Sequence, residues 1–291
     1  MPGGQHRGTA NPSSQMTSRR SLVVALLLLT CIPAIGSAAA KARVRPLVPD
    51  LAPLAPVDIL GPQTGFETTL GVDAPFMIDG CFPDERVRKS AQRCLRFDGI
   101  AANLGTGPLE VAYGPDPSRT DISAFQRIFN SDGSFKDRFA TSSEFHPTHA
   151  HFHIEDFYVA RLWRSSARGG KFGAEPIATG DKNGFCPEDS APVDREAPSG
   201  GGNYSCFTEG ERAGPEANQI VGISAGWKDI YRYGLPDQFV EITGVPDGYY
   251  ALEIELDPND VFREANETNN DVCVVLSLEG TTAELTPSLT C

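Results

Sequence analysis

Glycine and proline recur throughout this chain and leave little room for long helices. The 291 residues include 29 glycines and 23 prolines, which interrupt every candidate helix of any length. Both are poor in helix interiors, because proline lacks the amide hydrogen and glycine loses the most conformational entropy on ordering. The chain must therefore fold mainly from short strands joined by turns.

Several short segments alternate apolar and polar residues with a period of two, as half-buried strands do. The clearest is 249–256; it follows 239–242 and a Pro-Asp-Gly turn, so we predict a hairpin. Other strands are expected at residues 94–97 leading into 101–103, and at 109–113, 152–162 and 272–278. The expected fold class is all-β, a β-sandwich core with long irregular loops.

Two stretches look irregular, namely the Pro-rich lead at 45–62 and residues 172–202, which are rich in Gly, Pro, Glu and Asp. Long loops within a compact domain often carry function. No internal repeat or linker divides the remainder. We expect an N-terminal arm at 41–65 and one domain at 66–291.

The first forty residues have the layout of a secretory signal peptide. They contain three arginines and no acidic residue, with an apolar run at 22–29 and small residues at 36–40. The apolar run is too short to span a bilayer comfortably, and no later segment approaches about 18 uninterrupted apolar residues. We therefore expect a secreted protein without a membrane span.

Export changes the interpretation of the seven cysteines. Loss of residues 1–40 removes Cys31 and leaves six, an even number in an oxidising compartment, with no CxxC pair among them. Three disulfides that pin loops are the simplest arrangement. Sequence neighbours suggest Cys81 with Cys94, Cys186 with Cys206, and Cys273 with Cys291, although spacing alone cannot choose among the possible pairings.

The charge balance excludes one class of function. The chain holds 25 Lys and Arg against 38 Asp and Glu, a formal charge of −13. Removal of the signal peptide would deepen this charge to about −16. A nucleic-acid binder that relies on a basic surface is excluded, whereas an acidic surface suits the attraction of cationic amines.

Four of the five histidines, His146, His149, His151 and His153, lie within eight residues. On a strand, His149, His151 and His153 would present three imidazoles to one face. Such a trio suits Cu, Zn, Fe or Ni. His146 has a weaker claim, because Pro147 breaks the alternation, and would be a fourth ligand or a neighbour that orients one.

Alternatives to a catalytic metal stay open for this segment. A structural zinc site is one, and a surface loop that binds metal only adventitiously is another. Glu155 and Asp156 follow the histidines, and a carboxylate beside a metal is a candidate general base. For either acid alone, a solvated surface position is the alternative.

With its surroundings, the histidine segment resembles the copper-binding segment of the lysyl oxidase family, in which closely spaced histidines precede an acidic and aromatic stretch. Other segments of the resemblance recur in the same order, at 95–107, 182–189, 222–231 and 238–270. Together they span about residues 46–291, so the resemblance implies that residues 66–291 are a lysyl oxidase-like catalytic domain.

The resemblance implies an amine oxidase that converts primary amines, including peptidyl lysine, to aldehydes with O₂, releasing ammonia and hydrogen peroxide. Lysyl oxidases use copper and lysine tyrosylquinone, which forms when a lysine amine adds to an oxidised tyrosine. Carried over by motif, the lysine is Lys182 and the tyrosine is Tyr231. Copper would bind His149, His151 and His153.

Two further roles depend on this resemblance. Lys228 competes with Lys182, but three residues from Tyr231 on an extended segment it would point away from that ring. Asp156 is the expected base, because the further histidine that the family has after its copper ligands is absent here. The animal enzymes have a cysteine pair where this chain has Trp227 and Asp237.

A calcium site is also implied. In relatives, an Asp-Leu pair in the N-terminal arm meets an acidic, asparagine-rich turn near the C-terminus. Here the corresponding residues are Asp50, Leu51, Glu264, Asn266, Asn269 and Asn270. Hard oxygen donors of this kind suit calcium, and an asparagine-rich turn without an ion is the alternative.

Two other functions fit the same residues. An exported copper-binding protein without oxidase activity would hold metal on the histidines but never join Lys182 to Tyr231. A zinc hydrolase would turn over amides or esters without consuming oxygen and would not need Tyr231.

Overall fold

The computed structural model describes residues 43–56, 76–79, 81, 93–115, 122–146, 151–180, 182, 184–194, 202–206 and 220–291, with only the backbone at 76–79, 115 and 146. The proposed signal peptide lies outside these residues. Those of 43–291 belong to one unit. Across the described ranges, no helix is long and apolar enough to cross a membrane.

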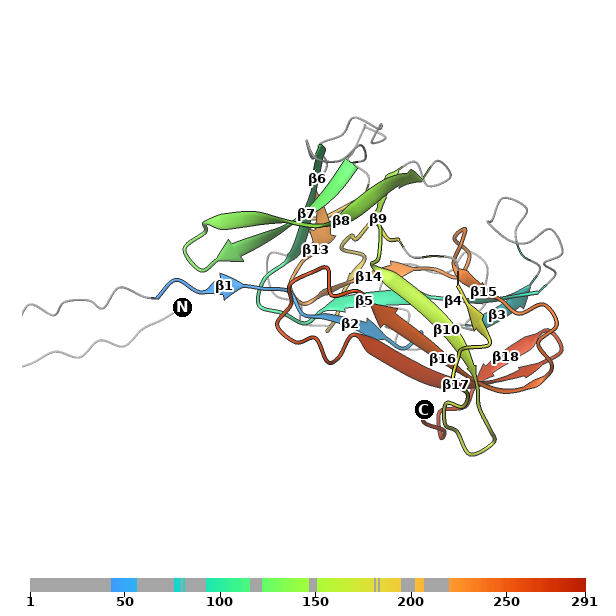
Figure 1. Ribbon diagram of the computed structural model, residues 1–291. Coiled ribbons are helices and arrows are strands. Elements are labelled where there is room, and N and C mark those ends of the chain that lie inside the picture. The colour runs from blue at the N-terminus through green and yellow to red at the C-terminus, as the bar shows by residue number, and fades with distance from the viewer. Residues whose placement is uncertain are drawn as a thin grey trace, which may run out of the picture. The chain divides into compact units, whose positions relative to one another are not determined.

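Strands supply the regular structure of this part of the chain, and they form four antiparallel sheets (Figure 1). A six-stranded sheet has the order β13-β6-β7-β8-β9, with β1 paired to β7. Its members are β1 (Pro46–Leu47), β6 (Leu109–Pro115), β7 (Ile122–Asn130), β8 (Phe135–His146), β9 (His151–Ile154) and β13 (Ile220–Ile223).

A five-stranded sheet has the order β11-β10-β16-β17-β18. It contains β10 (Tyr158–Arg164), β11 (Ala178–Thr179), β16 (Gly248–Leu256), β17 (Asp271–Glu279) and β18 (Thr282–Leu285). The four-stranded sheet β12-β14-β5-β2 contains β2 (Leu51–Leu54), β5 (Gly99–Asn103), β12 (Ala191–Pro192) and β14 (Trp227–Tyr231). The three-stranded sheet β15-β4-β3 contains β3 (Phe76–Asp79), β4 (Cys94–Phe97) and β15 (Phe239–Glu241).

The core lies where the five-stranded sheet meets the two smaller sheets. Strands β16 and β17 contact β2, while β18 contacts β3. Leu252 and Ile254 of β16 are fully buried and share one hydrophobic cluster with Leu51 of β2 and Leu95 of β4. The all-β expectation is confirmed: apolar faces of separate sheets pack against one another, and long connections run between them.

The predicted hairpin of residues 239–242 and 249–256 is wrong. Strand β15 pairs with β4, whereas β16 lies between β10 and β17. The central residues 250–254 are all buried, so β16 is covered on both faces, as a central strand is. The alternation located both strands, but it carried no information about their partners.

Two other expectations change at the strand boundaries. The single strand expected at 152–162 is divided into β9 and β10 by a turn in which Asp156 has a φ of 59°, a left-handed conformation that aspartate tolerates better than most residues. The N-terminal stretch expected to be irregular contains β1 and β2, and β2 completes a sheet beside β5. Residues 57–62 of that stretch lie outside the described ranges.

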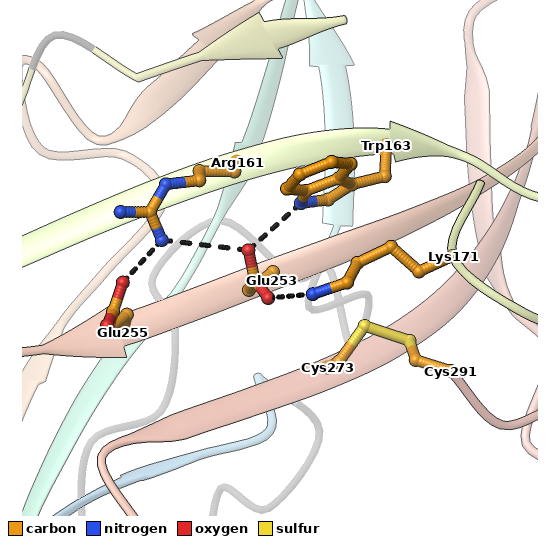
Figure 2. Close-up of polar contacts among 7 residues, drawn as sticks. All are labelled: Arg161, Trp163, Lys171, Glu253, Glu255, Cys273 and Cys291. Atoms are coloured by element: carbon orange, nitrogen blue, oxygen red, sulfur yellow. Dashed lines mark hydrogen bonds and ion pairs between the residues drawn. A yellow bond between two sulfur atoms is a disulfide. The ribbon is translucent and has the colours of Figure 1, made fainter. Parts of the chain in front are cut away.

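All three suggested disulfides are confirmed: Cys81–Cys94, Cys186–Cys206 and Cys273–Cys291. The third lies beside a polar group that we call the Glu253 cluster, consisting of Arg161, Trp163, Lys171, Glu253 and Glu255 (Figure 2). In it, Glu253 accepts hydrogen bonds from Lys171 Nζ and from Trp163 Nε1 (2.9 Å), and Arg161 pairs with Glu255. The cluster therefore links β10, β16 and the loop that carries Lys171.

Candidate functional site

Strand β9 carries two of the predicted copper ligands on one face. His151 and His153 are two residues apart, both are buried, and their Nε2 atoms lie 3.1 Å apart. Two imidazole nitrogens at about 2.0–2.1 Å from one ion lie at such a separation, so the pair fits a shared metal. His149 lies outside the described residues. His146 ends β8 opposite His151, and only its backbone is described.

Asp156, the predicted base, lies in the turn after β9. Its carboxylate Oδ2 accepts a hydrogen bond from Thr141 Oγ1 at 3.4 Å, which directs the side chain toward β8. The turn keeps Asp156 three residues from His153 along the chain, on the segment that connects β9 to β10.

The segment that follows Lys182 packs directly against the end of β9. Phe185 forms a β-bridge with Ile154, and Ile154 N donates to Phe185 O at 2.7 Å. A Cβ added to Gly184 would lie 2.9 Å from the Cβ of His153, a contact that real side chains do not make. Glycine at 184 therefore allows the loop to approach the histidine strand.

Lys182 is buried above the ring of Tyr231. Its Nζ lies 4.5 Å from the Tyr231 ring centroid and 5.0 Å from that of Phe185. Within the part of the chain that the structure describes, Nζ has no hydrogen-bond partner. Burial lowers the pKa of Lys182 to about 8, although the charges of Asp237 and Asp229 oppose this shift. The result is an amine that can lose its proton near neutral pH beside an aromatic ring.

The Tyr231 hydroxyl is fixed by the backbone of Cys186. It donates to Cys186 O and accepts from Cys186 N, both at 3.0 Å. The ring also packs on Phe185, with centroids 4.1 Å apart. Burial, followed by the charge of Asp229, raises the pKa of Tyr231 well above its ordinary value.

Cys186 links the tyrosine to the histidines. A ring nitrogen of His151 and the sulfur atoms of Cys186 and Cys206 lie within 4.8 Å of one another, and all three residues are buried. One continuous site thus forms from β9, β14 and the loop between β11 and β12. It contains the two described histidines, Cys186, Lys182 and Tyr231.

Asp229 lies within the segment 222–231 that contributes to the family resemblance, but the sequence alone indicates no role for it. It lies two residues before Tyr231 on β14, hence on the same face, and is fully buried. Ser190 Oγ donates to Oδ1 at 3.1 Å, whereas Oδ2 has no hydrogen-bond partner among the described residues. Burial, with the charge of Glu188 added, raises the pKa of Asp229 well above its ordinary value. The period-two spacing to Tyr231 was the available signal.

The neighbouring acid Asp189 has a structural role. Its carboxylate accepts hydrogen bonds from the backbone of residues 202–204 and from the backbone and hydroxyl of Ser224. Glu188 accepts from Cys206 N at 3.1 Å. These acids hold the Cys206 segment against the site.

The residues of the predicted calcium site meet in the structure, with one exception. Leu51 N donates to Glu264, and Asn269 Nδ2 donates to Asp50 Oδ1 at 2.9 Å. Asn270 Nδ2 donates to Glu264 Oε1 at 3.0 Å. Asn266 is exposed, and its Oδ1 instead accepts hydrogen bonds from Thr268 within the same turn.

The chemistry of this group fits a hard cation. Burial raises the pKa of Glu264 to about 8, and a carboxylate oxygen from each of Asp257, Glu264 and Glu267 lies within 4.8 Å of the others. In the described ranges, the Oδ1 atoms of Asn269 and Asn270 are buried without hydrogen-bond partners. Asp257 and Glu264 are buried and Glu267 is exposed, and clustered carboxylate oxygens of this kind are ligands that calcium prefers. Asp257 and Glu267 were not among the predicted ligands.

The chain is similar to several lysyl oxidase homologs. Among curated proteins, lysyl oxidase homolog 2B of Danio rerio is 28% identical over 248 residues, covering 84% of this chain and 26% of that protein. Lysyl oxidase homolog 3B of Danio rerio is 32% identical over 125 residues, covering 43% and 13%. Lysyl oxidase homolog 1 of Homo sapiens is 28% identical over 170 residues, covering 55% and 26%.

The chain thus spans about a quarter or less of the length of these relatives. The sequence profile of the family described as Lysyl oxidase matches residues 124–287, more than half of the chain. This match covers the histidine strand, Lys182, Tyr231 and the acidic turn at 264–270. The chain belongs to the lysyl oxidase family.

Proposed function

We propose that this protein is a secreted amine oxidase that depends on copper and lysine tyrosylquinone and converts primary amines, including peptidyl lysine, to aldehydes. The observation that carries the proposal is the position of Lys182 Nζ, 4.5 Å from the Tyr231 ring centroid. Membership of the lysyl oxidase family supports it.

The residues fit the two groups that this activity needs. His151 and His153, together with His149, would hold copper, and Lys182 and Tyr231 would supply the atoms of the quinone. When present, copper and the quinone supply the oxidising centre and the electrophilic carbonyl that side chains alone lack. Asp156 stays the predicted base for the proton on the substrate carbon next to the amine.

The chain's own residues prepare the lysine for bond formation. An ammonium has no lone pair, so Lys182 must lose a proton before it can add to an oxidised ring. Burial favours the neutral amine, and Asp229, whose charge acts on Lys182, offers a buried carboxylate oxygen to receive that proton. The two hydrogen bonds between the Tyr231 hydroxyl and the Cys186 backbone hold the Tyr231 ring in place meanwhile.

A calcium ion would join the N-terminal arm to the C-terminal turn. Asp50, Leu51, Glu264, Asn269 and Asn270 already connect these segments by hydrogen bonds, so an ion there would strengthen an existing junction. Asn266 would need to leave its turn to contribute.

The test is peroxide release by purified, copper-loaded protein over a panel of diamines and lysine-containing peptides. We expect oxygen-dependent peroxide and aldehyde from the wild-type chain and none from Tyr231→Phe, which keeps the ring and loses the hydroxyl. Copper bound without turnover of any amine would overturn the proposal and favour a copper-binding protein without oxidase activity.

A further inference from the structure

The Cys186–Cys206 disulfide lies against the histidine strand. Its two sulfurs and a ring nitrogen of His151 are mutually within 4.8 Å, with all three residues buried. His153 Nε2 is 3.1 Å from His151 Nε2, so a fourth donor is close. Among the described residues, this is the one group of possible metal ligands that contains sulfur.

We propose that this disulfide is the oxidised form of a second metal site. On reduction, the thiolates of Cys186 and Cys206 and the imidazole of His151 bind one Cu⁺ ion, with His153 available as a fourth ligand. Thiolates favour soft ions such as Cu⁺, and two thiolates with two imidazoles also form a common tetrahedral set.

The redox step balances with a dithiol as reductant. The S–S bond of Cys186–Cys206 breaks and takes up two electrons and two protons to give two thiols, while the dithiol is oxidised to a disulfide. Cu⁺ then displaces both protons as the thiolates bind it.

The surrounding hydrogen bonds would keep both cysteines in position after the disulfide is reduced. Glu188 accepts a hydrogen bond from Cys206 N, and the Cys186 backbone is bound to the Tyr231 hydroxyl, so neither cysteine depends on the disulfide alone for its position. The Cα atoms are 6.0 Å apart, a separation that two ligands of one ion also span.

The two metal sites compete for His151. Copper held by the histidines in the oxidised chain uses the same imidazole that the reduced cysteines would use. Reduction of the disulfide would therefore transfer His151 from a nitrogen-only site to a sulfur-containing one that binds copper supplied as Cu⁺, so the step needs no change in the oxidation state of the metal. This step concerns metal binding and holds whether or not the protein oxidises amines.

The test is an anaerobic titration of the metal-free, full-length mature protein, reduced with a phosphine, with Cu⁺ in competition with a chromophoric chelator. The control is Cys186→Ser/Cys206→Ser, which keeps the other four mature thiols and so carries the same background. We expect one additional tight Cu⁺ per chain in the wild type. Its affinity should fall at least about 100-fold in the control, since changing even residues that only orient a ligand costs about 10–100-fold.

A second measurement keeps the test valid if the double variant folds poorly. X-ray absorption of reduced, Cu⁺-loaded wild-type protein should report sulfur together with nitrogen neighbours, and His151→Ala should lose a nitrogen neighbour and weaken binding. Equal Cu⁺ stoichiometry and affinity in the wild type and the cysteine variant would overturn the proposal, as would a copper shell without sulfur.

Discussion

Two regions of this molecule each combine a lysine, an aromatic ring and a buried carboxylate, but the contacts among the three groups differ. In the Glu253 cluster, Lys171 Nζ lies 4.9 Å from the Trp163 ring centroid and donates a hydrogen bond to Glu253 (Figure 2). At the candidate site, Lys182 Nζ lies 4.5 Å from the Tyr231 ring centroid and, within the described ranges, donates to no acceptor. One lysine is paired, and the other is held beside its ring without a hydrogen bond.

The carboxylates show the same contrast. Burial acts to raise the pKa of Glu253, but hydrogen bonds from Lys171 and Trp163 outweigh it and lower that pKa. Burial also acts on Asp229, where the charge of Glu188 adds to it and the pKa rises well above its ordinary value. Paired charges stabilise the sheet, whereas buried groups with shifted pKa values are typical of reactive sites.

The largest expected effect separates the two lysines. Lys182→Met should abolish quinone formation and all amine oxidation, because no amine remains to add to Tyr231. Lys171→Met should leave oxidation unchanged and only lower the melting temperature, because Glu253 loses one of its donors. Peroxide release and thermal denaturation of both variants check this, and a Lys182→Met protein with wild-type turnover would break the comparison.

The second largest effect should separate the two acids, Asp229 and Glu253, in the rate of quinone formation. Asp229→Asn keeps the shape but removes the proton acceptor, so quinone formation after copper addition should slow by about 100-fold, as for loss of a general base. Glu253→Gln should form the quinone at the wild-type rate. The growth of visible absorbance with time measures both rates. Equal rates in the two variants would contradict the role of Asp229.

A third buried carboxylate, Glu264, tests whether the cluster of acidic and amide oxygens around it is an ion site. Calcium at 100 times its dissociation constant should stabilise the protein by about 2.7 kcal/mol. Glu264→Gln should remove this gain, whereas Asn266→Ala should retain it, because Asn266 is occupied within its own turn. Thermal melts with calcium and with chelator give the answer. A calcium response that survives Glu264→Gln would exclude this group.

The smallest expected effect is a pH dependence set by Lys182. Its folded pKa of about 8 lies below the ordinary 10.5, so the neutral amine should increase about tenfold per pH unit up to about pH 8 and then level off. The rate of quinone formation should follow this curve. Asp237→Asn removes the largest charge that raises this pKa, so its curve should shift to lower pH. An unshifted curve would mean that another group sets the rate.

The sequence predicted strands better than their partners. The alternation at 249–256 located β16, but the burial of both its faces comes from β10 and β17, which pair with it across long stretches of chain. Within residues 152–162, Asp156 stands in the alternating register of Phe152 and Ile154, and this acid was the one local sign of the turn. The cysteine neighbours, in contrast, were enough to suggest all three disulfides.

The candidate site likewise has features that the local sequence predicted and features that it did not. Histidine spacing predicted that His151 and His153 share a face, because that follows from local strand geometry. The pairing of Lys182 with Tyr231 came only from resemblance to a family, since by itself Lys182 has the pattern of a surface lysine. The hydrogen bonds between Cys186 and Tyr231 involve backbone atoms, which any sequence could supply, and so left no signal.

Mass analysis of proteolytic peptides tests the central claim most directly. After the metal-free protein is loaded with copper in the presence of oxygen, the peptides containing Lys182 and Tyr231 should appear as one covalently joined species with a visible quinone chromophore. The joined species should be missing from Lys182→Met. Separate peptides of unmodified mass, from folded protein with copper bound, would contradict the account.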